Sequence, residues 1–192
     1  MKRHSGGAFA EELGFRENSF GYVTTEYSRW QNFESRLRDV LFPALFEAAQ
    51  YTDIAVLRLE YWDRFKFEGI PAQADARALF SALDGAIPLS SIEGRALWHS
   101  HAGWFEEFSG TPYLINRNLD ANDFQDTDGA VKRCVSVYTL VEARLAGQDI
   151  GETEITRHLS EMHRRSVLLF GSSILQEVRA QIGLKLEAYE NG

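Results

Sequence analysis

Four side chains that could bind a ligand alternate along one segment near the middle of the chain. Every second position from Arg58 gives Glu60, Trp62 and Arg64, and a strand places alternate residues on one face. A guanidinium offers a planar fork of donors for an anion, and an indole offers a plane for stacking. The pattern predicts a ligand-binding surface or, as the interpretation that we favour, either a ladder of cross-strand ion pairs or a face covered by another subunit.

Two histidines are the next candidates for chemistry. His99 and His101 are two residues apart in a segment predicted to be a strand, so both side chains lie on the same face. Such a pair could bind a metal ion, but a protein metal site needs at least one further ligand. Glu106 falls on the opposite alternation. We therefore interpret the histidines as polar strand residues near a sheet edge and predict no metal and no other cofactor.

Other reactive side chains lack the neighbours that catalysis requires. Cys134 is the only cysteine and is predicted to be buried in a strand with no base nearby. Asp63 interrupts an apolar face, which favours a buried, paired carboxylate over a catalytic one. The acidic loop before Gly129 places Phe124 at the first ligand position of a calcium loop, so that motif fails. The serines after Gly171 indicate a helix-packing position. No catalytic residue is assigned, and the sequence favours a protein that is not an enzyme.

The elements that must hold these residues alternate between strands and helices. Segment 53–67 is the clearest strand, because apolar residues alternate with the polar set described above. The predicted strands are 15–25, 53–67, 96–108, 113–119 and 131–143. Runs of adjacent strands favour an α+β fold. We expect an antiparallel β-meander sheet of about five strands, with one long N-terminal helix, one short helix and a long C-terminal helix packed on it.

Sequence signals also place the helices. Ser28 and Gln31 have the spacing of a capping box at the start of the first helix, and Pro43 should kink it, end it or begin a new turn. A short helix is predicted over 72–83 and a long one over 152–186. The long helix carries a group of basic residues that we expect to be solvated: Arg157, His158, His163, Arg164 and Arg165.

The length, composition and net charge of the chain exclude several classes of protein. The 192 residues, 44% of them hydrophobic, suffice for one buried core. We expect a flexible lead over 1–13, a single domain over 14–187 and a tail over 188–192. The net charge of −8 disfavours nucleic-acid binding. One cysteine, no secretory signal and no apolar run of about 20 residues predict a cytoplasmic protein with no membrane association.

Three runs carry a resemblance to a known family. The first run, 22–30, contains a T-x-Y-x-x-W pattern. The second, 57–65, has an aspartate and an arginine immediately before Phe65. The third is 159–163, followed by Leu169 and Phe170. Together they resemble a sporadically distributed prokaryotic family of uncharacterised proteins, from about Gly21 onward. The usual N-terminal strand of that family is missing here, and Met162 stands where a leucine is expected. The resemblance implies no activity, and the family's distribution suggests mobile or defence-linked loci.

These observations support two hypotheses of function. The first is a non-enzymatic protein-interaction or assembly module that forms a homo-oligomer or binds a partner protein; on this hypothesis the partner supplies the missing strand. The alternative is a small-ligand-binding domain or enzyme with a polar pocket formed by Arg58, Glu60, Trp62, His99 and His101. Convergence of these side chains in one cleft would favour the alternative.

Overall fold

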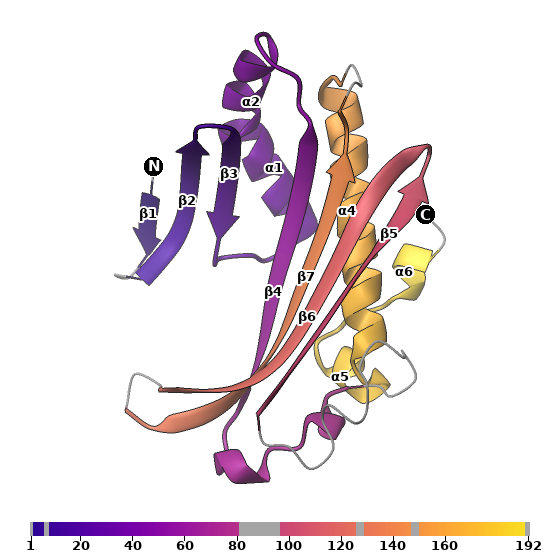
Figure 1. Cartoon of the computed structure of the whole chain (residues 1–192). Coiled ribbons are helices and arrows are strands. Elements are labelled where there is room, and N and C mark those ends of the chain that lie inside the picture. The colour runs from indigo at the N-terminus through magenta and orange to yellow at the C-terminus, as the bar shows by residue number, and fades with distance from the viewer. Residues whose placement is uncertain (1, 6–7, 81–96, 126–128, 147–149, 191–192) are drawn as a thin grey trace. The chain divides into compact units, whose positions relative to one another are not determined.

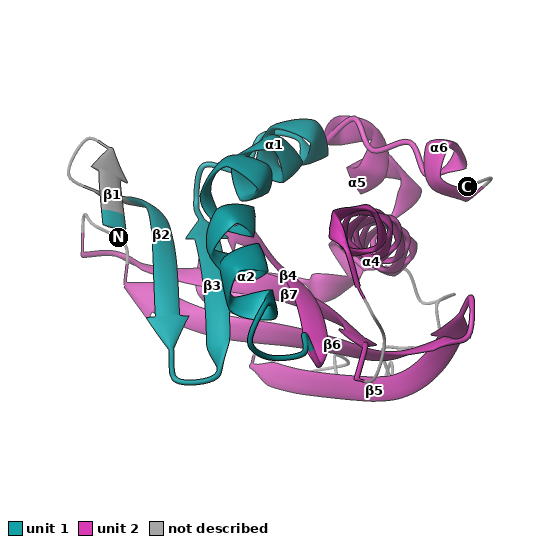
Figure 2. Cartoon of the chain, turned by 90° about the horizontal axis from the view of Figure 1, so that it is seen from above, with its two compact units in different colours: residues 1–54, 147–149 teal, residues 55–146, 150–192 magenta. Residues whose placement is uncertain are grey.

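The computed structural model describes residues 2–5, 8–80, 97–125, 129–146 and 150–190. The chain divides into two compact units, one of residues 1–54 with 147–149 and the other of residues 55–146 with 150–192 (Figure 2). The sequence predicts one domain over 14–187, whereas the N-terminal unit takes its own strands and helices from the first 54 residues. Mixed helix and strand content confirms the α+β class.

The N-terminal unit contains a three-stranded antiparallel sheet in the order β1-β2-β3 and two helices. Its elements are β1 (Lys2–Ser5), β2 (Ala8–Arg16), β3 (Ser19–Thr24), α1 (Trp30–Val40) and α2 (Phe42–Ala49). Residues 2–5 and 8–13, which fall in the predicted flexible lead, pair in strands instead. Strand pairing supplies partners for the backbone N–H and C=O groups of this segment.

The start of α1 also differs from the prediction. Arg29 occupies the N-cap without a side-chain capping bond, and the Ser28 hydroxyl instead accepts a hydrogen bond of 3.0 Å from the Asn32 amide. The capping box of Ser28 and Gln31 is thus wrong. The expectation for Pro43 is confirmed, because it lies in the first turn of α2, where a helix does not need its missing N–H.

The C-terminal unit is built on a four-stranded antiparallel sheet with the order β4-β7-β6-β5. Its strands are β4 (Val56–Phe67), β5 (Trp98–Phe108), β6 (Thr111–Gln125) and β7 (Val131–Arg144). Ser109 and Gly110 both have positive φ, 49° and 77°, which suits the tight turn that joins β5 to β6. Only β5, β6 and β7 form a meander, since β4 pairs with β7. Two sheets of three and four strands replace the predicted sheet of about five.

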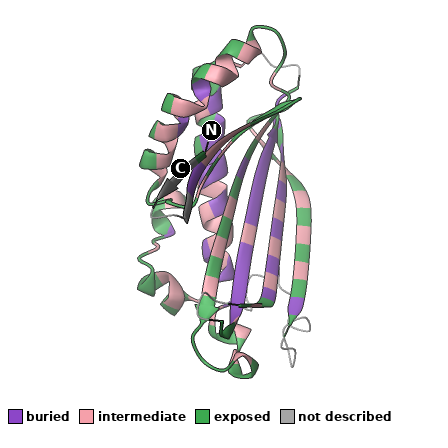
Figure 3. Ribbon diagram, turned by 90° about the vertical axis from the view of Figure 1, so that its left-hand side faces the viewer, coloured by how far each residue is buried: buried purple, intermediate pink, exposed green. Residues whose placement is uncertain are grey.

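Helix α4 (Glu152–Ser173) runs along one face of this sheet (Figure 1), which we call the helical face. Strand β7 is buried along nearly its whole length, whereas the outer strands β4 and β5 alternate in exposure (Figure 3). The predicted strand 53–67 is thereby confirmed, with Leu57, Leu59 and Tyr61 on the helical face. No helix within the described ranges has the length and apolarity needed to span a bilayer.

The long C-terminal helix predicted over 152–186 ends at Ser173 instead. Ile174 has extended backbone angles and forms a β-bridge with Phe80, and the Leu175 N–H donates to the Leu79 carbonyl at 2.9 Å. These tertiary hydrogen bonds override helix propensity. Two short helices follow, α5 (Gln176–Gln181) and α6 (Glu187–Glu190).

The short helix predicted over 72–83 is replaced by two 3₁₀ turns, η1 (Pro71–Gln73) and η2 (Ala76–Ala78). Asp75 ends any continuous helix here, because its carboxylate accepts a hydrogen bond of 2.9 Å from the Arg77 N–H and caps the second turn. Residues 81–83 of the predicted helix lie outside the described residues.

The basic group on α4 is solvated only in part: Arg157 is exposed as expected, whereas the other four residues make contacts within the unit. His158 and His163 are buried against the sheet, where their Nδ1 atoms lie 2.5 Å and 2.9 Å from the hydroxyls of Tyr113 and Tyr61. Arg164 and Arg165 both bind Glu161, at 2.8 Å and 2.6 Å. The periodicity of α4 turns this stretch toward the helical face, and hydrogen bonds satisfy its polar groups there.

Candidate functional site

All six residues proposed from the sequence lie on the side of the four-stranded sheet opposite α4, which we call the polar face. Paired residues of antiparallel strands point to the same side, so the register assigns this face directly. From β4 to β5 the face is built of Arg58, Glu60, Trp62, Arg64, Lys66, Ser136, Tyr138, Leu140, Glu142, Asn116, Asn118, Asp120, His99, His101, Phe105 and Glu107.

An ion-pair ladder occupies one end of the polar face. The Arg58 guanidinium lies 2.7 Å from Glu142 across the strand pair and 3.7 Å from Glu60 on its own strand. Arg144 binds the other oxygen of Glu142 at 3.3 Å. The hydrogen bond to Glu142 raises the pKa of Arg58, and Glu142 itself is buried. The ladder that the sequence favours is therefore present, and it holds β4 against β7.

Trp62 is the largest exposed side chain of the polar face. Its side chain is 62% exposed, although the Arg64 guanidinium lies over the indole at 4.7 Å and the Tyr138 ring meets it edge-on at 5.8 Å. Burial and the nearby Glu60 raise the pKa of Tyr138 to about 12, so its hydroxyl stays protonated at neutral pH. The two neighbours fix the indole in place while leaving its surface accessible.

The histidines lie at the other side of the polar face. The His99 Nδ1 atom contacts the Asp120 carboxylate, and the His101 ring lies 6.5 Å from that of His99. Glu106 points to the helical face, where it binds Arg165. Among the described residues, no group of three His, Cys, Asp or Glu side chains could hold a metal ion.

The polar face does not gather the predicted residues into one pocket. Arg58, Glu60 and Trp62 lie on β4, whereas His99 and His101 lie on β5, and these are the two outer strands. With β7 and β6 between them, the two groups are about 14 Å apart at ordinary strand spacing. The arrangement is a surface with an aromatic and basic side and a histidine and acidic side, rather than a cleft.

The remaining reactive side chains have mixed outcomes. Cys134 is buried as expected, with its Sγ atom 3.8 Å from the Ser136 hydroxyl. Gly171 is a packing position as expected, since a Cβ there would lie 2.3 Å from Leu186. Asp63 is half-buried on the helical face, and the expected hydrogen-bond or ion-pair partner is not among the described residues. Burial raises the pKa of Asp63 to about 6.

One polar cluster was not predicted from the sequence. In the N-terminal unit, the buried Glu11 carboxylate accepts hydrogen bonds from the Tyr22 hydroxyl at 2.6 Å and from Arg36 at 2.6 Å and 3.2 Å. The cluster ties β2 and β3 to α1. The prediction of a flexible lead left no place for this cluster. The available signal was that Glu11 lies between the apolar residues Phe9 and Leu13 on one strand alternation.

The polar face thus offers exposed aromatic and charged groups but no described nucleophile, acid–base pair or metal ligands set around a cleft. Its geometry suits the binding of another surface better than the enclosure of a substrate. Comparison with known proteins adds no further constraint, because no protein-family model, curated protein or solved structure matches this chain.

Proposed function

We propose that this protein is an interaction module that self-associates through the polar face of its four-stranded sheet. The observation that carries the proposal is Trp62, which is 62% exposed yet held in one position by Arg64 and Tyr138. Tryptophan, tyrosine and arginine are the residues enriched at the energetic centres of protein interfaces. A fixed indole also loses little conformational entropy on binding, which favours association.

The charges of the polar face support a second copy as the partner. Strand β4 presents three cations (Arg58, Arg64 and Lys66) and one anion, Glu60, whereas the β6–β5 side presents Asp120 and Glu107. A two-fold axis parallel to the strands places β4 of one copy over β5 of the other, so that opposite charges meet. An axis perpendicular to the strands places β4 over β4 and opposes like charges. The charge pattern therefore favours the parallel axis.

The strand register then predicts which residues of the two copies face each other. Arg64, Ser136, Asp120 and His99 form one row across the sheet. Because a two-fold axis along the strands keeps each row at its own height, Arg64 of one copy faces the Asp120–His99 pair of the other. In the adjacent row Trp62 faces His101 in the same way. Packed sheets are about 10 Å apart, a gap that these long side chains can fill.

The area of the polar face indicates how tightly two copies should associate. Four strands at about 4.8 Å spacing and about ten residues of about 3.4 Å give roughly 600 Å² per copy. The total of about 1,200 Å² lies at the lower end for specific complexes, so we expect a dissociation constant on the order of micromolar.

Sedimentation velocity over a concentration series tests the proposal. The wild-type protein should shift from monomer to dimer as its concentration rises, and Trp62→Ala should raise the dissociation constant at least about tenfold. Ile182→Ala is the matched control, because Ile182 is 51% exposed but lies at the end of α5. A strictly monomeric wild-type protein, or equal effects of the two variants, would overturn the proposal.

A further inference from the structure

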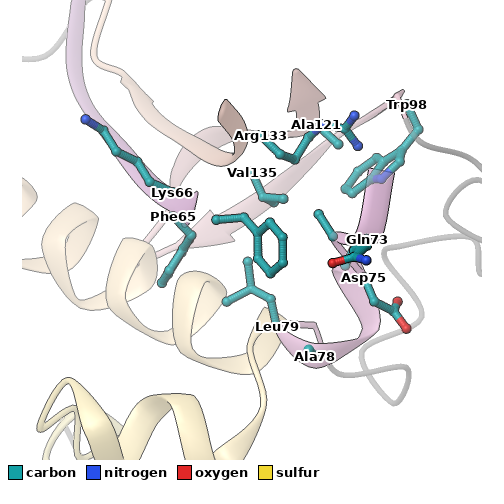
Figure 4. Close-up of a pocket in the computed structure, with 13 residues that line it drawn as sticks. Phe65, Lys66, Gln73, Asp75, Ala78, Leu79, Trp98, Ala121, Arg133 and Val135 are labelled. Atoms are coloured by element: carbon teal, nitrogen blue, oxygen red, sulfur yellow. The ribbon is translucent and has the colours of Figure 1, made fainter. Parts of the chain in front are cut away.

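The C-terminal unit contains a cavity on the helical face, at the end of the sheet where α4 stops (Figure 4). Its volume is about 280 Å³. Its apolar wall consists of Phe65, Phe67, Ala74, Ala76, Ala78, Leu79, Trp98, Ala121 and Val135. The cavity shares none of the six polar-face residues that were proposed from the sequence. Lys66, which is also on the polar face, lies at the rim of the cavity and points away from its centre.

The floor of the cavity is one cross-strand row of the sheet. Phe65 pairs with Val135, Val135 with Ala121, and Ala121 with Trp98, so the row crosses all four strands. Ala121 stands between two larger side chains and is itself only 2% exposed, so the row closes the base of the cavity.

The roof is the segment of η1 and η2, and tertiary hydrogen bonds hold it in place. The Leu79 carbonyl accepts from the Leu175 N–H at 2.9 Å, and Phe80 forms a β-bridge with Ile174. Phe65 is further fixed by stacking on Phe170, with the ring centroids 6.1 Å apart. Contacts of this kind pre-organise the described walls of the cavity for a ligand.

Two of the charged side chains that line the cavity, Arg133 and Asp75, already bind neighbours, and the third, Lys66, points away from its centre. Arg133 donates to the Asp123 carboxylate at 2.5 Å and 3.3 Å, and Asp75 accepts from Arg77 at 2.7 Å. An ionised ligand would therefore lose its hydration without gaining a dedicated partner, which is unfavourable. An uncharged apolar ligand loses nothing of this kind and buries its own surface.

The volume sets the size of that ligand. A cavity of about 150 Å³ lined by aliphatic and aromatic residues admits benzene, and the present cavity has about 280 Å³. From the apolar row, the satisfied charges and this volume, we infer that the cavity binds a small uncharged molecule of about two fused aromatic rings. Trp98 and Phe65, at opposite ends of the row, can contact the edges of such a ring system.

Titration of the full-length protein with indole, followed by NMR of the methyl groups of Leu79 and Val135, tests this inference. Indole has about nine non-hydrogen atoms, so the dissociation constant should be on the order of 0.1–1 mM. Benzene should shift the same methyl signals, whereas naphthalene-2-sulfonate, a bicyclic anion, should bind at least about tenfold more weakly. The absence of saturable shifts with indole up to about 5 mM would overturn the inference.

Two variants locate the binding. Ala121→Leu fills the space above the row, and Ala78→Trp obstructs the cavity from the exposed η2 turn should the buried substitution prevent folding. Each folded variant should bind indole at least about tenfold more weakly than the wild type. Unchanged binding in a folded variant would place indole elsewhere and refute the inference. Trp62→Ala should leave indole binding intact, which separates this test from that of self-association.

Discussion

The protonation of His163 should limit the stability of the protein at acidic pH. His163 is 7% exposed, and its Nδ1 atom lies 2.9 Å from the Tyr61 hydroxyl. Burial lowers the pKa of His163 from 6.5 to about 4. The folded state therefore retains a neutral imidazole in a pH range where the unfolded chain binds a proton.

The sign and size of the effect follow from this difference. Above pH 6.5 the imidazole is neutral in both states, and its contribution to stability is fully present. As pH falls from 6.5 toward about 4, the unfolded state is protonated first and stability is lost. A difference of about 2.5 pKa units at about 1.4 kcal/mol each gives a loss of about 3 kcal/mol.

Asp63 acts in the opposite direction over part of this range. Burial raises the pKa of Asp63 from 3.8 to about 6, so its folded form gains a proton first and stability increases as pH falls through about 6 toward 3.8. The two effects offset each other, and the pH profile of the wild-type protein alone cannot reveal either. The informative quantity is the difference between the wild type and a variant that lacks one group.

His163→Gln is the appropriate change, because glutamine is neutral at all pH values concerned and can still accept from Tyr61. Urea denaturation of both proteins at several pH values between 7 and about 4 gives their free energies of unfolding. The wild type should lose about 3 kcal/mol relative to the variant over this range. Parallel profiles for the two proteins would show that His163 is protonated equally in both states and would refute the reasoning.

Three further changes test other contacts, each by urea denaturation. Glu142→Ala should destabilise the protein by about 1–3 kcal/mol, because the buried carboxylate binds Arg58 and Arg144. Glu60→Ala, at an exposed position, should change the free energy of unfolding by no more than about 0.5 kcal/mol. Equal losses in the two variants would contradict the role of Glu142 in the ion-pair ladder. Asp63→Asn should stabilise by up to about 3 kcal/mol at pH 7, with the gain vanishing below about pH 4; a gain independent of pH would exclude its titration as the cause. Gly171→Ala should cost about 1–3 kcal/mol, since the new Cβ meets Leu186, and adding Leu186→Ala should cost less than the sum of the two single changes; strict additivity would show no contact.

Local patterns in the sequence located all four strands of the C-terminal unit, but they ended the strand over 113–119 too early and treated Asp120 and Asp123 as loop residues, whereas β6 runs to Gln125. The alternation from Arg58 to Arg64 identified both the strand and the residues that share a face, because side-chain direction in a strand depends only on position. It could not place β4 beside β7 instead of β5, since strand order depends on tertiary pairing. For the same reason it could not show that His99 and Trp62 lie on opposite outer strands.

The errors occurred where tertiary contacts outweigh local preference. The apolar spacing from Ile155 to Ile182 is continuous, but Ile174 leaves the helix to pair with Phe80, a contact with a distant segment. Residues 1–13 lack a strong apolar pattern, so their pairing in β1 and β2 was not predicted. The cavity was also beyond the sequence, because it depends on Ala121 standing between Val135 and Trp98 in the register.

In the proposed dimer, β4 of each copy lies over β5 of the other, which places Arg64 against the Asp120–His99 pair of the second copy. Arg64→Glu and Asp120→Lys should each oppose like charges at both contacts of the dimer and abolish association. An equimolar mixture of these two variants restores opposite charges at both contacts. Sedimentation velocity of the mixture should therefore recover a dimer that neither variant forms alone, and a mixture that remains monomeric would contradict the account.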